Sequence, residues 1–486
     1  MDLLGYCDPL CSRAGRPLSF HVSSRRGAPF RAEIVRLRQT DRSPEAPPFL
    51  TEPVPSELNG RQFAGRAQEI PTGSYVRVPH SPRLSPPSSF TLHAWVYPTR
   101  LPGAGDEPQG LLCNGGRDAG FALVLEPGGS LGLRLGGARA STGMPLQERH
   151  WCFVAATVAR DDSQGLAEVS LYQIPAKHWP VGSGAFHPEP QTLAITTGTA
   201  SPLPLLLAAL HNPSEKGGDV VLSNHFCGKL DSPGILGEAL GPDDVSRLAE
   251  SGDGSFPSRV ASWDFSAGTG VVVHDRCGEH DGIAVNAPTR GATGHSYSGE
   301  EVDPRLRPAE WSGKQPHDHP WHDQPGCVSK TSAKIVWTGC HFHDTDLDDA
   351  CWEQSFEWRI PQGTPAGFYA ARVFTSEGEE DMVPFIVSST PGETGNTLCF
   401  LAPTVSYLAY SNQIFNGNPH GAEQGLEGLP AEDAQMRESG LLSLYDLHSD
   451  KSGVCYSSSR RPLLNLRPVR PPQPASTSLA PPLATV

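Results

Sequence analysis

Glycine and proline are frequent in this chain, and they constrain its fold more than any other feature. Of the 486 residues, 51 are Gly and 48 are Pro. Both residues end regular elements and form turns, so this chain suits many short strands better than long helices. Runs such as SSFTLHAWVYP, GFALVLEPGGSLGLRLGG and RHWCFVAATVA supply strands of about five to seven residues with Gly-rich turns between them. The sequence predicts a mainly β protein.

The charge balance and the cysteines indicate the compartment and exclude some partners. The chain has 38 basic and 53 acidic residues, which argues against nucleic acid or an anionic membrane as a partner. Its 11 cysteines are an odd number without a C-x-x-C pair, which favours reduced thiols. No apolar run approaches the roughly 20 residues of a membrane span, and the first residues lack the pattern of a signal peptide. We expect a soluble, cytoplasmic protein.

Strand-like patterns divide the chain into several domains. The first segment and a later stretch with the runs FEWRI, FYAARVF and MVPFIV both alternate apolar and polar residues, as half-buried strands do. We expect these two to share a β-sandwich, interrupted by an inserted jelly roll and followed by the start of an incomplete α/β domain. The expected domains are 1–80 (N-terminal β segment), 81–290 (jelly roll), 291–390 (β-sandwich segment), 391–467 (α/β portion) and 468–486 (disordered Pro/Ser/Ala-rich tail).

The inserted segment resembles a concanavalin-like or laminin-G-like jelly roll. The resemblance rests on the order SSFTLHAWVYP, GFALVLE, RHWCFVAATV and then a G-K-L-D strand. That fold hosts many functions, so it implies little about the ligand. Two alternatives remain for this segment: an architectural module, or a carbohydrate-binding module.

Two apolar runs near the C-terminus each lead to a tyrosine. Leu398–Ala402 is expected to be a strand, followed by a helix that Thr404 caps and that carries Tyr407. Leu441–Leu444 is expected to be a second strand, ending at Tyr445. Ligands of open α/β sheets lie beyond the carboxyl ends of strands, where both tyrosines would stand. The alternative is that both aromatic rings fill the core.

Several long motifs resemble the large subunit of N,N-dimethylformamidase. They are GYCDPLCSRAGRPLSFHVSS, TGCHFHDTDLDDACWEQSFEWRIPQGTPAGFYAARV, APTVSYLAYSNQ and YDLHSDKSGVCYSSSRRP, and the resemblance runs from residue 5 to about residue 467. It implies an amide hydrolase that splits the formamide C–N bond with one iron ion held by two tyrosinates and a glutamate. The tyrosinates carry over to Tyr407 and Tyr445, with Tyr410 and Tyr456 as neighbours that must be told apart from them. Phenolate is a hard anionic donor, which suits a mononuclear Fe(III).

Three polar residues lie close to these tyrosines in the sequence. His448 and Asp450 follow Tyr445 and could hydrogen-bond to the metal ligands. Asn412 could orient the substrate, although the alternative of a polar residue at a helix end is favoured. No other catalytic group is assigned, and neither a G-x-S-x-G nor a G-x-G-x-x-G motif occurs.

Two histidine-rich segments raise the alternative of an imidazole metal site. They are HDHPWHD at 317–323 and HFHDTDLDD at 341–349. The first lacks regular ligand spacing, and His341 and His343 are expected on one face of a strand. A loop that shapes the mouth of the active site, or a subunit contact, is the favoured interpretation of both.

The resemblance also implies a partner and an expectation about activity. The glutamate ligand of the family lies beyond the S-S-x-R-R-P motif, whereas no acidic residue follows Asp450 here. We therefore expect that this chain is truncated, that it is inactive alone, and that apolar surface at 397–403 and 441–444 is left uncovered. The implied reaction converts N,N-dimethylformamide, a small neutral amide, and water to dimethylamine and formate. The implied assembly is a hetero-oligomer with a small partner subunit and further self-association. A non-catalytic carbohydrate-binding or structural protein is the alternative.

Overall fold

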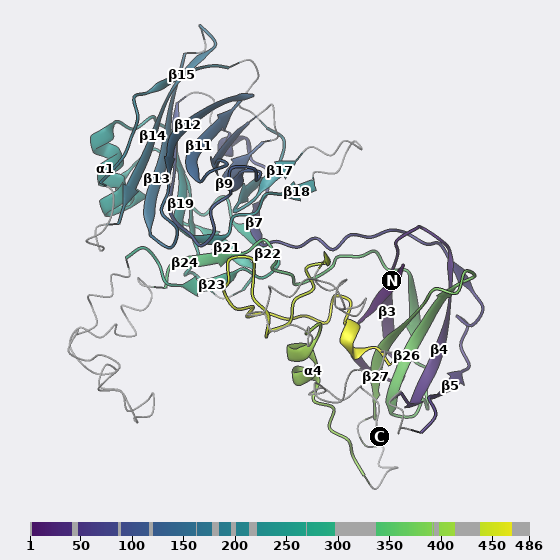
Figure 1. Ribbon diagram of the computed structural model, residues 1–486. Helices are drawn as coiled ribbons and strands as arrows, with labels where there is room; N and C mark the ends of the chain where they lie inside the picture. Colours follow the sequence, from purple (N-terminus) through teal and green to yellow (C-terminus); the bar gives the residue numbers. More distant parts are fainter. Residues whose placement is uncertain are drawn as a thin grey trace, which may run out of the picture. The chain divides into compact units, whose positions relative to one another are not determined.

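The structure is a computed structural model, in which the chain divides into two compact units (Figure 1). Unit 1 comprises Met1–Thr72 and Thr345–Val486, and unit 2 comprises Gly73–Asp344. The described residues are 2–40, 47–85, 89–115, 120–161, 163–176, 184–195, 201–212, 221–268, 270–296, 337–390, 392, 398–413 and 438–468. The segment 317–323 and all of the expected tail after residue 468 lie outside this set.

Unit 2 is built almost entirely from antiparallel strands. Sixteen of them form one sheet. Fourteen follow the order β12-β11-β10-β9-β16-β7-β22-β21-β20-β19-β8-β13-β14-β15, and β23 and β24 lie off this path, where β24 pairs with both β19 and β23. The strands are β7 (Tyr75–Val78), β8 (Phe90–Pro98), β9 (Gln109–Asn114), β10 (Phe121–Leu125), β11 (Ser130–Leu135), β12 (Ala138–Pro145), β13 (Cys152–Asp161), β14 (Leu166–Pro175), β15 (Gln191–Ala194), β16 (Leu205–Leu207), β17 (Leu210–Asn212), β18 (Val221–Ser223), β19 (Gly228–Leu236), β20 (Arg259–Asp264), β21 (Val272–Asp275), β22 (Gly282–Val285), β23 (Thr289–Ala292) and β24 (Gly339–Phe342).

The core of unit 2 follows from the period of two in its strands. In β8 the alternate residues Phe90, Leu92, Ala94 and Val96 are fully buried in one hydrophobic cluster. Each large side chain buried in this way contributes about 1.5–3 kcal/mol relative to exposure. The alternation seen in the sequence therefore predicts the inward face of this strand correctly.

One α-helix covers part of unit 2. Helix α1 (Pro242–Ser251) begins with a proline and ends at Gly252, which has a positive φ of 71°. Asp243 and Asp244 lie in its first turn, where a negative charge favours the helix dipole. Val245 and Leu248 pack in a hydrophobic cluster that includes Phe153 of β13. The proline and the acidic residues at its start and the glycine after its end are the local sequence signals of such a helix. The short 3-10 helices η1 (Pro82–Leu84) and η2 (Asp253–Ser255) also lie in this unit.

Unit 1 contains a β-sandwich made from both ends of the chain. One sheet has the order β1-β3-β25, and the other has the order β2-β27-β26-β4-β5 with β6 paired to β4. The strands are β1 (Leu3–Asp8), β2 (Cys11–Arg13), β3 (Pro17–Ser24), β4 (Phe30–Gln39), β5 (Leu50–Val54), β6 (Gln62–Phe63), β25 (Phe356–Arg359), β26 (Gly367–Thr375) and β27 (Glu380–Ser388). Because β25 pairs with β3 and β26 with β4, the expected sharing of strands is confirmed. The protein is therefore multidomain and mainly β, while the finer division into five domains stays a prediction.

The sandwich encloses an aromatic core. Phe20 of β3 stacks on Phe356 of the neighbouring β25, with ring centroids 4.9 Å apart, and meets Phe385 of β27 edge-on at 5.6 Å. Trp358 and Tyr369 are buried in the same cluster. The two sheets are thus held together by side chains from segments that lie far apart in the sequence.

The two apolar runs that precede the tyrosines are not strands. Residues 398–403 and 441–444 have no ladder partner, and helix α4 (Thr404–Tyr410) begins at Thr404, directly after Pro403. Leu398, Leu401 and Val405 are 89%, 88% and 82% exposed, which confirms the uncovered apolar surface expected in the first run. The expectation for the second run is wrong, because Leu441 is fully buried with other apolar side chains of unit 1. The 3-10 helix η6 (Leu464–Leu466) closes the described part of the chain.

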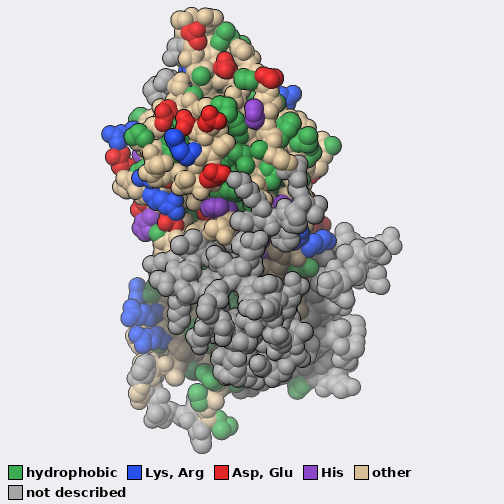
Figure 2. Space-filling model, turned by 90° about the vertical axis from the view of Figure 1, so that its left-hand side faces the viewer, with side chains coloured by type: hydrophobic (Ala, Val, Ile, Leu, Met, Phe, Trp, Pro, Cys, Tyr) green, Lys and Arg blue, Asp and Glu red, His purple; other side chains and the backbone are tan. Residues whose placement is uncertain are grey.

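The charges of the described residues are spread over the surface. In the upper part of Figure 2, acidic and basic side chains lie interspersed among polar and hydrophobic ones. In the described part of the chain, no helix is both long enough and apolar enough to cross a membrane.

Candidate functional site

Tyr407 lies on helix α4 in unit 1 and is partly buried. Its ring packs against a small apolar cluster formed by Leu10, Leu463 and Leu466. This burial raises the pKa of the Tyr407 phenol, because the phenolate is less stable away from water. Without a neighbouring positive charge, Tyr407 therefore remains a neutral phenol at ordinary pH.

Tyr445 is stacked on Tyr410. The two ring centroids are 4.6 Å apart and the planes are 18° from parallel, while Tyr445 remains 51% exposed. A hydrogen bond between the two hydroxyl groups raises the pKa of Tyr445. The backbone fixes this arrangement, since the amide of Leu444 donates to the carbonyl of Ala409 at 3.2 Å.

A phenol cluster at helix α4 consists of Tyr407, Tyr410 and Tyr445. Tyr407 and Tyr410 are three residues apart on the helix, so they lie on neighbouring parts of its surface, and Tyr445 joins them through Tyr410. Among the described residues, no ring contact or hydrogen bond joins Tyr407 directly to Tyr445. The sequence could not place Tyr410 in this group, because the stack depends on the path of residues 441–446 past the helix.

Asn412 holds the chain beyond helix α4 in place. It is fully buried and has a left-handed φ of 62°, a conformation that Asn adopts more readily than most residues. Its amide nitrogen donates to the carbonyl of Pro462 at 3.0 Å, and its amide oxygen accepts from the backbone N–H of Leu464 at 2.8 Å. These bonds favour the structural alternative over a role in orienting substrate.

His448 and Asp450 lie on one turn after Tyr445. His448 is buried, with Nδ1 2.9 Å from the hydroxyl of Thr345 and Nε2 3.5 Å from a carboxylate oxygen of Asp346. Asp450 accepts hydrogen bonds from the backbone N–H and the hydroxyl of Ser452, at 2.9 and 2.5 Å. Asp450 therefore fixes the turn, and His448 reaches from it to the segment around residue 345.

Ion pairs and hydrogen bonds join this segment to the region after Tyr445. Arg460 lies 2.5 Å from Asp348 and 3.2 Å from Asp349, and Tyr456 donates to Asp348 at 2.9 Å. The sequence motifs around 345–352 and 445–461 are thus brought together in unit 1. The opposite charges of the two motifs are the signal in the sequence that could indicate these pairs.

Arg461 is a buried cation in the same region. Its Nη2 donates to the carbonyl of Leu442 at 2.7 Å and to the hydroxyl of Ser457 at 3.1 Å. Burial lowers the pKa of its guanidinium to about 10. The bond to Leu442 anchors the backbone three residues before Tyr445. Arg461 therefore helps to fix the position of Tyr445 through the backbone.

The phenol cluster matches a hard metal ion in the kind of donor it offers. Phenolate oxygen suits a trivalent ion such as Fe(III), and the charge of the ion would drive loss of the phenol protons. Tyr445 is half exposed, and Tyr407 is partly buried. The phenol oxygens therefore fit an Fe(III) ion chemically. Because Tyr445 is stacked on Tyr410, experiment must distinguish which of these two tyrosines is the ligand.

Comparison with known proteins shows which proteins this chain is similar to. A family model described as N,N-dimethylformamidase beta subunit-like, C-terminal, matches residues 305–481. The N,N-dimethylformamidase beta subunits of Alcaligenes sp and Paracoccus aminophilus are each 31% identical to this chain, over 492 and 500 residues. Both alignments cover 96% of this chain. The chain is homologous to N,N-dimethylformamidase beta subunits.

The homology has a defined extent. The chain spans 60% of the length of each of these two relatives. A second family model, the Concanavalin A-like lectin/glucanases superfamily, matches residues 71–173, which supports the expected jelly roll in unit 2. A solved structure, the Ruminococcus gnavus IT-sialidase CBM40 bound to alpha2,3 sialyllactose, is 16% identical and covers 37% of this chain and 94% of its own. Its TM-score of 0.25 is too low to support any statement about function.

Proposed function

We propose that this chain is a subunit of an amide hydrolase of the N,N-dimethylformamidase type, acting on N,N-dimethylformamide and water to give dimethylamine and formate. The observation that carries the proposal is the 31% identity to dimethylformamidase beta subunits over 96% of the chain. Tyr407 and Tyr445 lie inside the segment that the dimethylformamidase family model matches. We assign the large, catalytic role to this chain and a small partner subunit to the complete enzyme.

In this proposal Tyr407 and Tyr445 hold a single Fe(III) through their phenolate oxygens. The ion would supply Lewis acidity that polarises the formyl oxygen and lowers the pKa of water. Packing against Leu10, Leu463 and Leu466 holds the side chain of Tyr407 in place. Tyr410 supports Tyr445 by stacking on it and sharing a hydrogen bond with its hydroxyl.

The surrounding residues keep these phenols in place. Asn412 fixes the chain after helix α4, Arg461 holds the backbone before Tyr445, and His448 with Asp450 fixes the turn after it. The third ligand implied by the family resemblance, a carboxylate, is assigned to no residue of this chain. A small neutral amide needs no charged binding group, so the side chains around helix α4 would orient the substrate.

Iron content and colour test the metal assignment. The purified chain, supplied with iron and with its partner subunit, is expected to bind about one iron per chain and to absorb visible light through tyrosinate-to-Fe(III) charge transfer. Tyr407→Phe and Tyr445→Phe each remove one donor oxygen, so each is expected to lose iron and colour. Tyr456→Phe is the matched control and should keep both, since Tyr456 bonds to Asp348 instead.

The same variants distinguish the two stacked tyrosines. Tyr410→Phe should keep its iron if Tyr445 is the ligand, and it should shift the absorption because the hydrogen bond to Tyr445 is lost. Full iron occupancy in both Tyr407→Phe and Tyr445→Phe would overturn the assignment. Release of dimethylamine from N,N-dimethylformamide, measured on the same samples, tests the reaction itself.

A further inference from the structure

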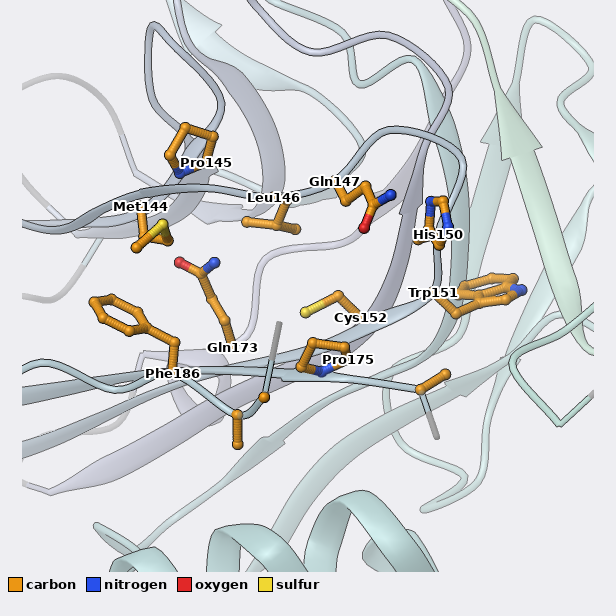
Figure 3. A pocket seen from close by; sticks show the side chains of 13 residues that line it. Met144, Pro145, Leu146, Gln147, His150, Trp151, Cys152, Gln173, Pro175 and Phe186 are labelled. Atoms are coloured by element: carbon orange, nitrogen blue, oxygen red, sulfur yellow. The ribbon is translucent and has the colours of Figure 1, made fainter. Parts of the chain in front are cut away.

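Unit 2 contains a cavity far in sequence from the tyrosines. Its volume is about 250 Å³, and it lies between the end of β12, the start of β13, the end of β14 and residues 184–186. Figure 3 shows Met144 and Leu146 on one side and Phe186 and Pro175 on the other, with Gln173 and Cys152 between them. The cavity is smaller than the roughly 300–1,000 Å³ of pockets for drug-sized ligands, so its ligand must be small.

Backbone hydrogen bonds hold the walls of this cavity in place. Gln173 and Phe186 exchange two backbone hydrogen bonds, each 2.8 Å long. The register of β13 and β14 places Cys152 opposite Pro175, and the N–H of Ala176 donates to the carbonyl of Trp151 at 2.9 Å. The cavity is therefore formed before a ligand binds, so little ordering opposes binding.

The lining of the cavity selects for a neutral compound. Of the 13 described residues that line it, none is Asp, Glu, Lys or Arg. His150 turns its Nδ1 to the carbonyl of Glu148 at 2.8 Å. Burial raises the pKa of the Cys152 thiol to about 12, so this thiol is uncharged at ordinary pH. A charged ligand would lose its hydration without gaining a partner here.

Among the described residues, one polar group in the cavity lacks a hydrogen-bond partner. Gln173 is only 5% exposed, and its buried amide oxygen has no hydrogen-bond partner among the described residues. In Figure 3 its carboxamide points into the space between Met144, Leu146 and Phe186. Buried polar atoms in native proteins are nearly always satisfied, so this one points to a ligand that donates to it.

The chemistry of Gln173 narrows the class of ligand. Its side chain offers an acceptor and a donor on one planar group, and a primary or secondary carboxamide is the neutral group that matches both at once. We propose that this cavity binds a small carboxamide with an apolar substituent, its amide paired with Gln173 and its substituent between Leu146, Met144 and Phe186. The site lies in unit 2 and does not depend on the amide-hydrolase proposal for unit 1.

Binding of benzamide to the full-length chain tests the proposal. Ligand-observed NMR and titration calorimetry are expected to give saturable binding of benzamide. Gln173→Leu keeps the volume and removes both hydrogen-bonding atoms, so it should weaken benzamide at least tenfold while leaving binding of toluene equal or tighter. Gln164→Leu, an exposed glutamine of the same unit, is the matched control and should bind benzamide as the wild type does.

The side-chain amide of Gln173 gives a second readout on the unaltered chain. Its N–H resonances in an NMR spectrum should shift on addition of benzamide and not on addition of dimethylamine. Absence of benzamide binding at millimolar concentration, equal affinity in Gln173→Leu with unchanged thermal unfolding, or unaltered resonances of the Gln173 side-chain amide would each overturn the proposal. Saturable binding of methyl glycosides with the same dependence on Gln173 would overturn the assignment of the ligand as a carboxamide.

Discussion

Arg467 and Asp381 form a buried, two-point ion pair in unit 1. Nε of Arg467 lies 2.8 Å from one carboxylate oxygen of Asp381, and Nη2 lies 2.9 Å from the other. Gly5 of β1 joins the pair, because its N–H donates to Asp381 and its carbonyl accepts from Arg467. The pair thus ties the segment after η6 to both sheets of the sandwich.

Removal of one partner from this pair should be costly. Arg467→Met leaves a buried carboxylate without its cation, so we expect a loss of about 3–5 kcal/mol in the free energy of unfolding. Arg467→Met with Asp381→Leu should recover most of that loss, because no charge remains buried. Arg372→Met is the surface control; Arg372 pairs with Glu33 and Glu380 near solvent, and its loss should cost about 1 kcal/mol or less. Urea unfolding measures all three, and equal losses for Arg467→Met and Arg372→Met would contradict the prediction.

Substitution of Asn412 separates its two roles in the backbone. Asn412→Gly keeps the left-handed conformation and loses both side-chain hydrogen bonds, which should destabilise unit 1 by about 2 kcal/mol. Asn412→Ala also places a Cβ in the left-handed region, which should add about 1 kcal/mol. Hydrogen exchange at the amide of Leu464 is the local measurement, since this amide donates to Asn412. Unchanged protection of that amide in both variants would refute the assignment.

The stability of unit 2 should fall as the pH falls below 6.5. His93 is buried, and burial lowers its pKa from 6.5 to about 4, so the folded state takes up its proton at lower pH than the unfolded state does. Between pH 6.5 and 5 the unfolded state binds more protons than the folded state. A single such histidine lowers the free energy of unfolding by about 2 kcal/mol over this range. Burial lowers the pKa of His211 as well, so His211 adds to the loss in the same direction.

His93→Gln removes one titrating group and should flatten this pH dependence. The comparison uses the slope of unfolding free energy against pH, because the substitution also changes stability at every pH. His80→Gln, at an exposed position of the same unit, should leave the slope as it is. A slope in His93→Gln equal to that of the wild type would show that other groups control the loss.

The exposed apolar residues before helix α4 should govern association rather than stability. Leu398→Ser combined with Leu401→Ser changes side chains that are almost fully exposed, so unfolding should shift by no more than about 0.5 kcal/mol. Self-association, followed by light scattering, should decrease because a contiguous apolar surface is removed. Leu441→Ser is the buried counterpart and should cost several kcal/mol. Unaltered scattering in the double variant would contradict this interpretation.

Local patterns predict the regular part of this fold. The alternation in β8 and the Pro-Asp-Asp start of α1 are properties of neighbouring residues, and each is confirmed in the structure. The apolar run at 398–402 has a similar local pattern but is not a strand. A strand also needs a partner for its ladder, and a short apolar run does not carry that information.

The contacts of the candidate site could not be predicted from local patterns, because they join segments that lie apart in the sequence. The family resemblance predicts Tyr407 and Tyr445 as metal ligands, but it could not show that Tyr445 stacks on Tyr410. Arg460, Arg461 and Arg467 lie close together in the sequence. In the structure Arg460 pairs with Asp348, Arg461 donates to the carbonyl of Leu442, and Arg467 pairs with Asp381. The sequence shows the charge of each residue, whereas the fold determines its burial and its partner.

The insertion of unit 2 into the sandwich also sets an order of synthesis. Glu33 of β4 lies opposite Arg372 of β26, which is 339 residues later in the chain. At a translation rate of about 5–20 residues per second, β4 leaves the ribosome roughly 20–70 s before its neighbour exists. The inserted strands emerge within that interval and contain their own hydrophobic cluster. Synthesis of the β-sandwich of unit 1 therefore begins before that of unit 2 and ends after it. Until β26 is made, β4 lacks its neighbour in the sheet and must be kept from pairing with other strands.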